Sequence, residues 1–304
     1  MTVRRFIVGE GDGPTVSEIV ALAAPGDARA IADGRVFLGR KRVQSATEPV
    51  HPGDDVTIGS AVEDAPEDVR VLARGARWIA VDKPAGTPTI PDHGGASHAL
   101  LTLAARAVGL DPSRLHATSR LDRDVSGVVI FALDSEIAAS LQRERDEHRY
   151  ARRYVALASR APREDAGTWD APIGRAKDPR HRAVNGRDPT TARTHFAVVA
   201  RATTAAALLA LAPVTGRTHQ LRVHASHAGV PLIGDRTYGA PPRLTLPTGK
   251  VLTLDRIALH AARVTVFGSA IDSPIPPLLR ETWRALGGDE GDWERAVAWD
   301  LPSA

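Results

Sequence analysis

The sequence contains no cysteine, so disulfide bonds, thiolate metal ligands and cysteine nucleophiles are all excluded. It also lacks any run of about 18 apolar residues, and residues 1–9 lack the long apolar core of a secretory signal. These absences indicate neither membrane insertion nor export, and we expect a soluble cytoplasmic protein. The 304 residues are enough for one large and one small domain, because domains commonly hold about 100–200 residues.

Lysine is scarce, whereas arginine is abundant. Lysine occurs at four positions, so arginine supplies 35 of the 39 basic residues, although the net charge is only +3. A high genomic GC content can produce such a bias by itself. Arginine is also the side chain best suited to bidentate phosphate contacts and to stacking on bases. Composition therefore permits an anionic polymer as partner without establishing one.

The first 60 residues have the pattern of a helix followed by a hairpin. Apolar residues recur at helical spacing from Thr15 to Ala32 and are interrupted by Pro25-Gly26, which predicts two short helices. Short β-rich pieces follow at Val36–Leu38 and Val56–Ile58, separated by turn signals. We therefore expect a compact module.

An acidic segment without periodicity, residues 61–70, separates this module from the rest of the chain. The pattern predicts a linker there. The expected organisation is a small domain at 1–60, the linker at 61–70, a large domain at 71–286 and a tail at 287–304, for which we have no interpretation.

The large domain alternates strand and helix patterns, which predicts a mixed fold built on a large sheet. The segment 127–134 has the apolar, β-branched composition of a buried strand, so residues 119–126 are expected to form a loop at its end. A surface helix capped by Ser135 should follow. The basic stretch 174–193, with its Gly and Pro breaks, has the pattern of a mobile loop, either a solvated excursion or a clamp on RNA phosphates.

The loop sequence SRLDRDVSG, residues 119–127, concentrates charge directly before the buried strand. In an extended conformation Arg120, Asp122 and Asp124 would point to one side. A carboxylate flanked by guanidinium groups stays ionised and can act as a nucleophile or base. The alternative is an ordinary surface ion pair, since such pairs are common in loops.

A second polar concentration occurs in TGRTHQLRVHASHAGVPLIGDRTYG, residues 215–239. The residues 216–218 form a predicted turn. Polar residues then occupy alternate positions, Gln220, Arg222 and His224, which predicts a strand with one polar face.

Four segments, in this order, resemble the signature segments of the RluA-type pseudouridine synthase family: VDKPAG at 81–86, SRLDRDVSG at 119–127, ARRYVAL at 151–157 and the 215–239 segment. The resemblance covers roughly residues 71–286. It implies an α+β catalytic domain with a mixed, largely antiparallel sheet, flanking helices and a central RNA cleft. It also implies isomerisation of uridine in RNA: the glycosidic bond breaks, the uracil rotates, and it is rejoined through carbon 5, with no cofactor and no metal.

The N-terminal part resembles, through residues 31–43 and 50–58, the small α/β RNA-binding domain named after a small-subunit ribosomal protein. The resemblance implies that this module contributes to RNA binding.

The resemblance implies catalytic roles for three residues. Asp122 matches the essential aspartate of the family, which attacks either the ribose or the base, and Arg222 matches its basic partner, an expected bidentate ion pair. Tyr154 matches the tyrosine that stacks on the target uracil. Taken alone, Arg222 could be a surface residue at a strand edge, and Tyr154 could be an ordinary core residue.

RNA-binding roles follow from the same resemblance. Arg120 matches a residue that holds the RNA helix open once the target uridine is flipped out, a step that chemistry on a stacked nucleotide requires. Further contacts are expected along the cleft, where Lys83 should add charge near the mouth. The residues expected on the RNA side are Arg217, Thr218, His219 and Gln220.

Two positions depart from the family pattern, because Ser119 replaces the usual His and Val125 the usual Thr. The change at 119 puts substrate choice or affinity in doubt more than the reaction. A noncatalytic RNA-binding relative is therefore the main alternative, against which the retention of Asp122, Tyr154 and Arg222 argues. A metal hydrolase built on the histidines of 215–239 would need HExxH spacing, which is absent, and Asp122 with Asp124 fits a glycosidase poorly.

The sequence does not identify the RNA, because specificity in this family depends on loop contacts and RNA shape. Ribosomal RNA is the first expectation and transfer RNA the second. We expect a monomer, because no apolar helical stripe is left unpaired.

Overall fold

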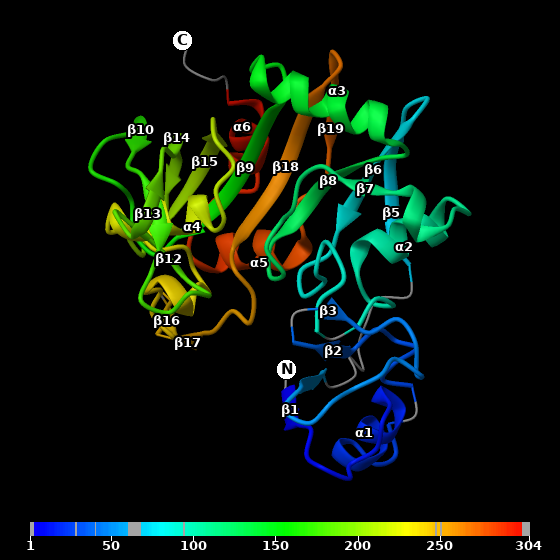
Figure 1. The fold of residues 1–304 in the computed structure, drawn as a ribbon. Helices are drawn as coiled ribbons and strands as arrows, with labels where there is room; N and C mark the ends of the chain where they lie inside the picture. Colours follow the sequence, from blue (N-terminus) through cyan, green and yellow to red (C-terminus); the bar gives the residue numbers. More distant parts are fainter. Residues whose placement is uncertain are drawn as a thin grey trace.

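The structure, a computed structural model, describes residues 3–27, 29–39, 41–59, 68–93, 95–246, 248–249 and 251–299. A ten-stranded sheet dominates it, with the strand order β10-β14-β15-β9-β18-β8-β6-β5, β19 beside β18 and β7 beside β8 (Figure 1). The strands are β5 (Arg70–Arg74), β6 (Trp78–Lys83), β7 (His116–Ala117), β8 (Ser126–Ala132), β9 (Ala151–Ala158), β10 (Ala166–Asp170), β14 (Arg193–Arg201), β15 (Ala207–Pro213), β18 (Leu259–Val266) and β19 (Ser269–Asp272). The fold is α+β, as predicted.

The middle of the sheet is buried on both faces. On β9, Tyr154 and Ala156 contribute to one apolar cluster, whereas Val155 and Leu157 contribute to another, because successive side chains of a strand point to opposite faces. The helix α4 (Gln220–His227) covers the first face, and α5 (Pro277–Ala285) with α6 (Asp292–Ala298) covers the second. Burying each large apolar side chain contributes roughly 1.5–3 kcal/mol.

The half of the sheet that contains β6 and β8 is covered by two more helices, one on each face. The helix α2 (Leu100–Ala107) packs on β6 and β8 through Leu100 and Leu103, and α3 (Ser135–Asp146) packs on the opposite face through Leu141. Asp134, not Ser135, is the N-cap of α3, since its side chain accepts a hydrogen bond from the Ile137 N–H. The predicted cap was therefore one residue too late.

Two halves of the sheet meet where β8 lies parallel to β18, with His260 opposite Ser126 and Ala261 opposite Gly127. The other strand pairs described in this sheet are antiparallel. Gly127 has φ +117°, and a Cβ there would overlap the backbone of Ala261. Glycine at this position therefore permits the close approach of β8 to β18.

A four-stranded sheet lies in the N-terminal part, in the order β1 (Val3–Ile7), β4 (Asp55–Gly59), β2 (Val36–Leu38) and β3 (Lys41–Arg42). With α1 (Val16–Ala23) it encloses its own apolar cluster. Only α1 forms between Thr15 and Ala32, in place of the two predicted helices; turns follow it in the described residues. Of the expected linker, residues 61–67 lie outside the described residues.

The N-terminal module contacts the segment that follows β6 at Asp92, His93 and Ala96. The Ala96 N–H donates to the Asp33 carbonyl at 2.6 Å, and Arg42 Nη2 donates to the Asp92 carbonyl at 2.9 Å. The rings of Phe37 and His93 lie 4.2 Å apart.

The basic stretch 174–193 is not a loop. It forms most of a three-stranded sheet of β12 (Arg182–Val184), β11 (Ile173–Arg175) and β13 (Arg187–Thr190). Its Gly residues allow close pairing, because a Cβ at Gly174 or Gly186 would collide with the neighbouring backbone. The breaks in the sequence pattern are thus turns of a small sheet.

The uninterpreted segment after Leu286 contains α6, whose Trp293 and Ala296 lie in the same apolar cluster as α5. A two-stranded ribbon, β16 (Leu244–Thr245) with β17 (Val251–Leu252), precedes β18. Within the described ranges, no helix has the length and apolar character needed to cross a bilayer.

Candidate active site

The loop before β8 is held in place through its backbone. Thr89 Oγ1 accepts a hydrogen bond from the Leu121 N–H at 3.1 Å and donates one to the Leu121 carbonyl at 2.9 Å. The Val125 N–H donates to the Asp122 carbonyl at 3.1 Å, which closes a turn. Because the backbone on both sides of Asp122 is fixed, its side chain points from a defined position. Asp124 lines a different pocket, so the loop does not present all its charges to one side.

Lys83 lies beneath this loop and not at the mouth of a cleft, so the sequence-based placement was wrong. Its side chain is fully buried, and its ammonium donates to the carbonyls of Pro84, Arg123 and Val125 at 3.1, 2.8 and 2.6 Å. Burial lowers the pKa of Lys83 to about 7, although the nearby Asp124 raises it in part. Its role is to hold the loop.

The segment 220–227 is the helix α4, not a strand. Leu221 and Ala225, four residues apart, face the apolar cluster on the sheet, while Val223 packs in a separate cluster. The polar residues between them are also buried, Gln220 and His224 being bonded within the protein. Because residues 220–225 are buried on every side of the helix, its polar and apolar residues do not separate into two faces. Their alternation along the sequence therefore resembles the pattern of a strand.

Asp122 and Arg222, one hundred residues apart in sequence, meet directly. Arg222 Nη1 donates to Asp122 Oδ2 at 2.9 Å, while Nε and Nη2 donate to the two oxygens of Asp235 at 2.7 and 2.9 Å. Arg222 is nearly buried and Asp235 fully so, whereas the Asp122 side chain is 25% exposed. Burial lowers the pKa of Arg222, but its bonds to Asp235 and Asp122 raise it by more. A fixed guanidinium therefore orients an accessible carboxylate.

Tyr238 and His219 extend this network. The Arg222 guanidinium lies over the Tyr238 ring, 4.8 Å from its centre. The Tyr238 hydroxyl accepts from the Arg182 N–H at 3.0 Å and lies 2.7 Å from His219 Nδ1, to which it can therefore donate its proton. Nε2 of His219 lies 3.8 Å from Asp122 Oδ2. Burial lowers the pKa of His219, which favours the neutral ring.

His219 has a left-handed backbone, with φ 58°, at the start of α4. Such a conformation is uncommon outside glycine and is often found at functional sites. It turns the chain so that the helix begins directly beside Asp122.

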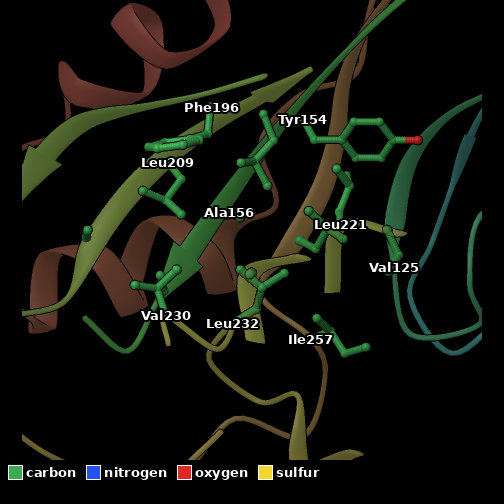
Figure 2. Close-up of a cluster of buried hydrophobic side chains, with 14 of the residues drawn as sticks. Val125, Tyr154, Ala156, Phe196, Leu209, Leu221, Val230, Leu232 and Ile257 are labelled. Atoms are coloured by element: carbon green, nitrogen blue, oxygen red, sulfur yellow. The ribbon is translucent and has the colours of Figure 1, made fainter. Parts of the chain in front are cut away.

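The pocket beside Asp122 is lined by both halves of the sheet. Tyr154 extends from β9 toward the segment that carries Val125, with its hydroxyl at the far end of the ring (Figure 2). Within the described residues this hydroxyl has no hydrogen-bond partner, and burial raises its pKa. The full lining is Arg120, Leu121, Asp122, Val125, Arg152, Tyr154, Pro213, Thr215, Gly216, Arg217, His219, Gln220, Leu221, Arg222 and Leu259.

Seven of the nine residues expected from the sequence thus line one pocket. Thr218 lines the adjoining groove that reaches Phe37 of the N-terminal sheet, and Lys83 lies below. Gln220 is only 4% exposed, and its amide bonds to Thr215 Oγ1, the Arg217 N–H and the Arg193 carbonyl. It therefore shapes the turn 215–219 and offers little surface to RNA.

The sequence reasoning missed Asp235 and Tyr238 as parts of this site. Both lie in the 215–239 segment, but nothing in the sequence shows that one clamps Arg222 and the other stacks on it. It also gave no role to Arg152, which lines the pocket. Of the histidines considered as metal ligands, His224 contacts Thr194 and the Ala171 carbonyl. Among the described residues, no three His, Asp or Glu side chains gather as a metal site.

Solved structures define the class of this fold. The human RNA pseudouridylate synthase domain containing 1 superimposes with a TM-score of 0.59 at 24% identity, over 80% of this chain and 100% of that chain. The molecule therefore has the fold of a pseudouridine synthase domain.

Sequence comparison then places the chain in its family. The model of the RNA pseudouridylate synthase family matches residues 77–227. An uncharacterised RNA pseudouridine synthase of Bacillus subtilis is 34% identical over 224 residues, 71% of each chain. Ribosomal large subunit pseudouridine synthase D of Xanthomonas campestris is 32% identical over 254 residues, 77% of this chain and 75% of that protein. The chain belongs to the RluA-type RNA pseudouridine synthases, which are isomerases acting on uridine in RNA.

Proposed function

We propose that this enzyme isomerises a uridine in structured RNA with Asp122 as the nucleophile. The carboxylate attacks the ribose or the base of a flipped-out uridine and the bond between N1 and C1′ breaks. C5 then bonds to C1′, and the bond to the Asp122 carboxylate breaks, which restores the free carboxylate. The proton displaced from C5 is balanced by one gained at N1. The observation that carries the proposal is the bond from Arg222 to the exposed carboxylate of Asp122 inside the lined pocket.

Tyr154 lies under the uracil in this proposal. Its ring borders the pocket, and its hydroxyl, kept protonated by the raised pKa, is free to donate a hydrogen bond to the base. Arg120 makes no hydrogen bond or ion pair within the described residues, which leaves its guanidinium available to replace the flipped base in the RNA stack.

Ribosomal RNA is the substrate class that we propose first, with transfer RNA second. The support is the Xanthomonas relative, whose name assigns it to the large ribosomal subunit. We also propose that the protein divides at residues 60 and 70, and that the segment after residue 286 belongs to the large domain, because α6 packs in its core. We propose that the N-terminal module binds RNA, because a groove continues from Asp122 to Phe37 of that module. We propose that the enzyme acts in the cytoplasm as a monomer.

The test is to map pseudouridine in total RNA from cells that carry the native gene, a gene deletion, or Asp122→Asn. The variant keeps the shape of the side chain but removes its charge, so RNA binding should survive and the modification should vanish. Asp124→Asn is the matched control, since Asp124 lies two residues away and lines another pocket. Modification that persists in Asp122→Asn refutes the nucleophile. A map that is the same with and without the gene favours the noncatalytic alternative.

A further inference from the structure

A second, arginine-rich pocket opens from the catalytic pocket on the side of α3. The two share Arg120, Arg152 and the turn 215–217, and the second pocket has a volume of about 510 Å³, which is in the range of ligand sites. Its lining is Thr118, Ser119, Arg120, Gln142, Arg145, Asp146, His148, Arg152, Val214, Thr215, Gly216 and Arg217.

The arginines of this pocket have no carboxylate partner among the described residues. None of Arg120, Arg145, Arg152 and Arg217 forms an ion pair there. Asp146, the one carboxylate in the lining, accepts a hydrogen bond from Gln142 Nε2 at 2.9 Å. Four arginines therefore line one cavity without a carboxylate partner for their charges among the described residues, which favours the binding of an anion there.

Some arginines elsewhere on the surface are paired with carboxylates. Within the small sheet, Arg175 pairs with Asp188, and beside it Arg193 Nη2 pairs with Asp170 at 2.6 Å. The basic stretch 174–193, abundant in charge by sequence, is thus partly compensated. The second pocket, which sequence reasoning did not identify, keeps its positive charge.

Two of the pocket arginines are held in fixed positions. The Arg145 guanidinium donates to the Thr118 carbonyl and hydroxyl and lies over the Tyr150 ring, 4.6 Å from its centre. Arg152 Nη2 donates to the Thr215 carbonyl at 2.9 Å. A fixed guanidinium loses little entropy on binding a phosphate, and its planar donors suit the phosphate oxygens.

We propose that this pocket binds the RNA phosphodiester next to the target uridine. The inference rests on the proposed function, because it requires a uridine in the catalytic pocket. Each nucleotide carries a phosphate on either side, so a strand that enters the catalytic pocket must leave it past the shared Arg120, Arg152 and Arg217. The arginine-rich pocket lies on that path and has one carboxylate in its lining, Asp146, whereas the groove toward Phe37 sets two carboxylates, Asp92 and Asp122, beside its arginines. Arg145 is the binding residue that belongs to the second pocket alone.

The experiment measures the binding of the full chain to a 12-residue oligouridylate at several salt concentrations. Arg145→Gln should weaken binding on the order of tenfold and reduce the slope of log affinity against log salt by about 0.7, the value for one lost phosphate contact on a single strand. Arg143→Gln, on the same helix but outside the pocket, should change neither. Arg145→Lys keeps the charge and should restore the slope, which separates charge from the packing on Tyr150.

A second measurement needs no substitution. The native chain should bind an oligouridylate with uncharged methylphosphonate linkages more weakly than one with phosphodiester linkages. The loss of affinity between the two oligonucleotides should be smaller for Arg145→Gln than for the native chain. Equal effects of Arg145→Gln and Arg143→Gln, or binding that salt does not weaken, would overturn the proposal. Arg145-dependent binding together with a cellular pseudouridine map that is the same with and without the gene would instead refute the proposed isomerisation while supporting the phosphate site.

Discussion

Asp235→Asn tests whether the clamp on Arg222 positions the carboxylate of Asp122, the proposed nucleophile. Asp235 accepts two charge-assisted hydrogen bonds from Arg222, at 2.7 and 2.9 Å, and is 1% exposed. The amide keeps one acceptor, but its N–H₂ group would face a guanidinium donor. Arg222 would then retain only Asp122 as a charged partner.

The magnitudes follow from the burial of this pair. Removing one partner of a buried ion pair costs about 3–5 kcal/mol, and the remaining bond to Asp122 places the expected loss near 3 kcal/mol. A shift of Arg222 displaces Asp122, and misplacement by about 1 Å costs on the order of 10²-fold in rate. We therefore expect kcat to fall about 10²-fold with little change in KM, because no substrate contact is removed.

The assay combines urea unfolding with single-turnover pseudouridine formation on a substrate RNA. Asp255→Asn is the matched control, since Asp255 lines the same pocket as Asp235 but is 97% exposed and lies 4.0 Å from Arg236. It should match the native protein in both measurements. A native kcat in Asp235→Asn would show that Asp235 does not position Asp122, and the reasoning from the network would be wrong.

Three further predictions concern the fold and the chemistry. Burial lowers the pKa of His260 to about 3, so below about pH 6.5 the unfolded chain binds a proton at this residue that the native state does not bind, and the native protein loses stability. The variant His260→Asn keeps an acceptor for Ser126 but cannot take up this proton. Between pH 7 and 4.5 its free energy of unfolding, measured by denaturation, should therefore fall by roughly 2 kcal/mol less than that of the native protein. Equal losses would contradict this. Gly127→Ala should lower the free energy of unfolding by more than about 3 kcal/mol, because residue 127 has φ +117° and a Cβ there would overlap the backbone of Ala261. A variant with the melting temperature of the native protein would disprove the close approach of β8 to β18. Tyr154→Phe should keep stability and RNA binding but lower kcat by about 10²-fold, because it removes the hydroxyl that donates to the base. An unchanged kcat would show that the hydroxyl has no role and that the ring acts only by stacking on the uracil.

Sequence patterns predicted the strands well and the helix of the site badly. The run at 127–134 supplies most of the buried strand β8, because β-branched and other apolar residues suit both faces of a central strand. The helix α4 gives no helical pattern of apolar residues in the sequence, because its residues 220–225 are all buried, whether polar or apolar. The apolar periodicity of a helix arises when one face is buried and the other is exposed. A helix whose faces are all buried lacks this periodicity.

The site itself followed from the family resemblance more than from spacing. Asp122 and Arg222 were paired in advance through their motifs, and the structure places them in contact through one hydrogen bond. The bidentate geometry expected for this pair was wrong, because Arg222 makes its bidentate pair with Asp235. The sequence could not show that Lys83 would be buried, since lysine is usually exposed and only the three carbonyls around it make burial tolerable. Asp235 escaped notice for the same reason: its partner is set by the tertiary fold.

The seam between β8 and β18 bears on how the enzyme is made. Asp122 precedes β8, whereas Tyr154 and Arg222 belong to the half of the sheet completed by β18, near the end of the chain. A growing polypeptide can pair β6 with β8 early, yet it cannot assemble the pocket until residues 259–266 have been synthesised and inserted between β8 and β9. Such distant pairing is slow to form, so catalytic competence should arise last during synthesis, after the N-terminal sheet has already folded.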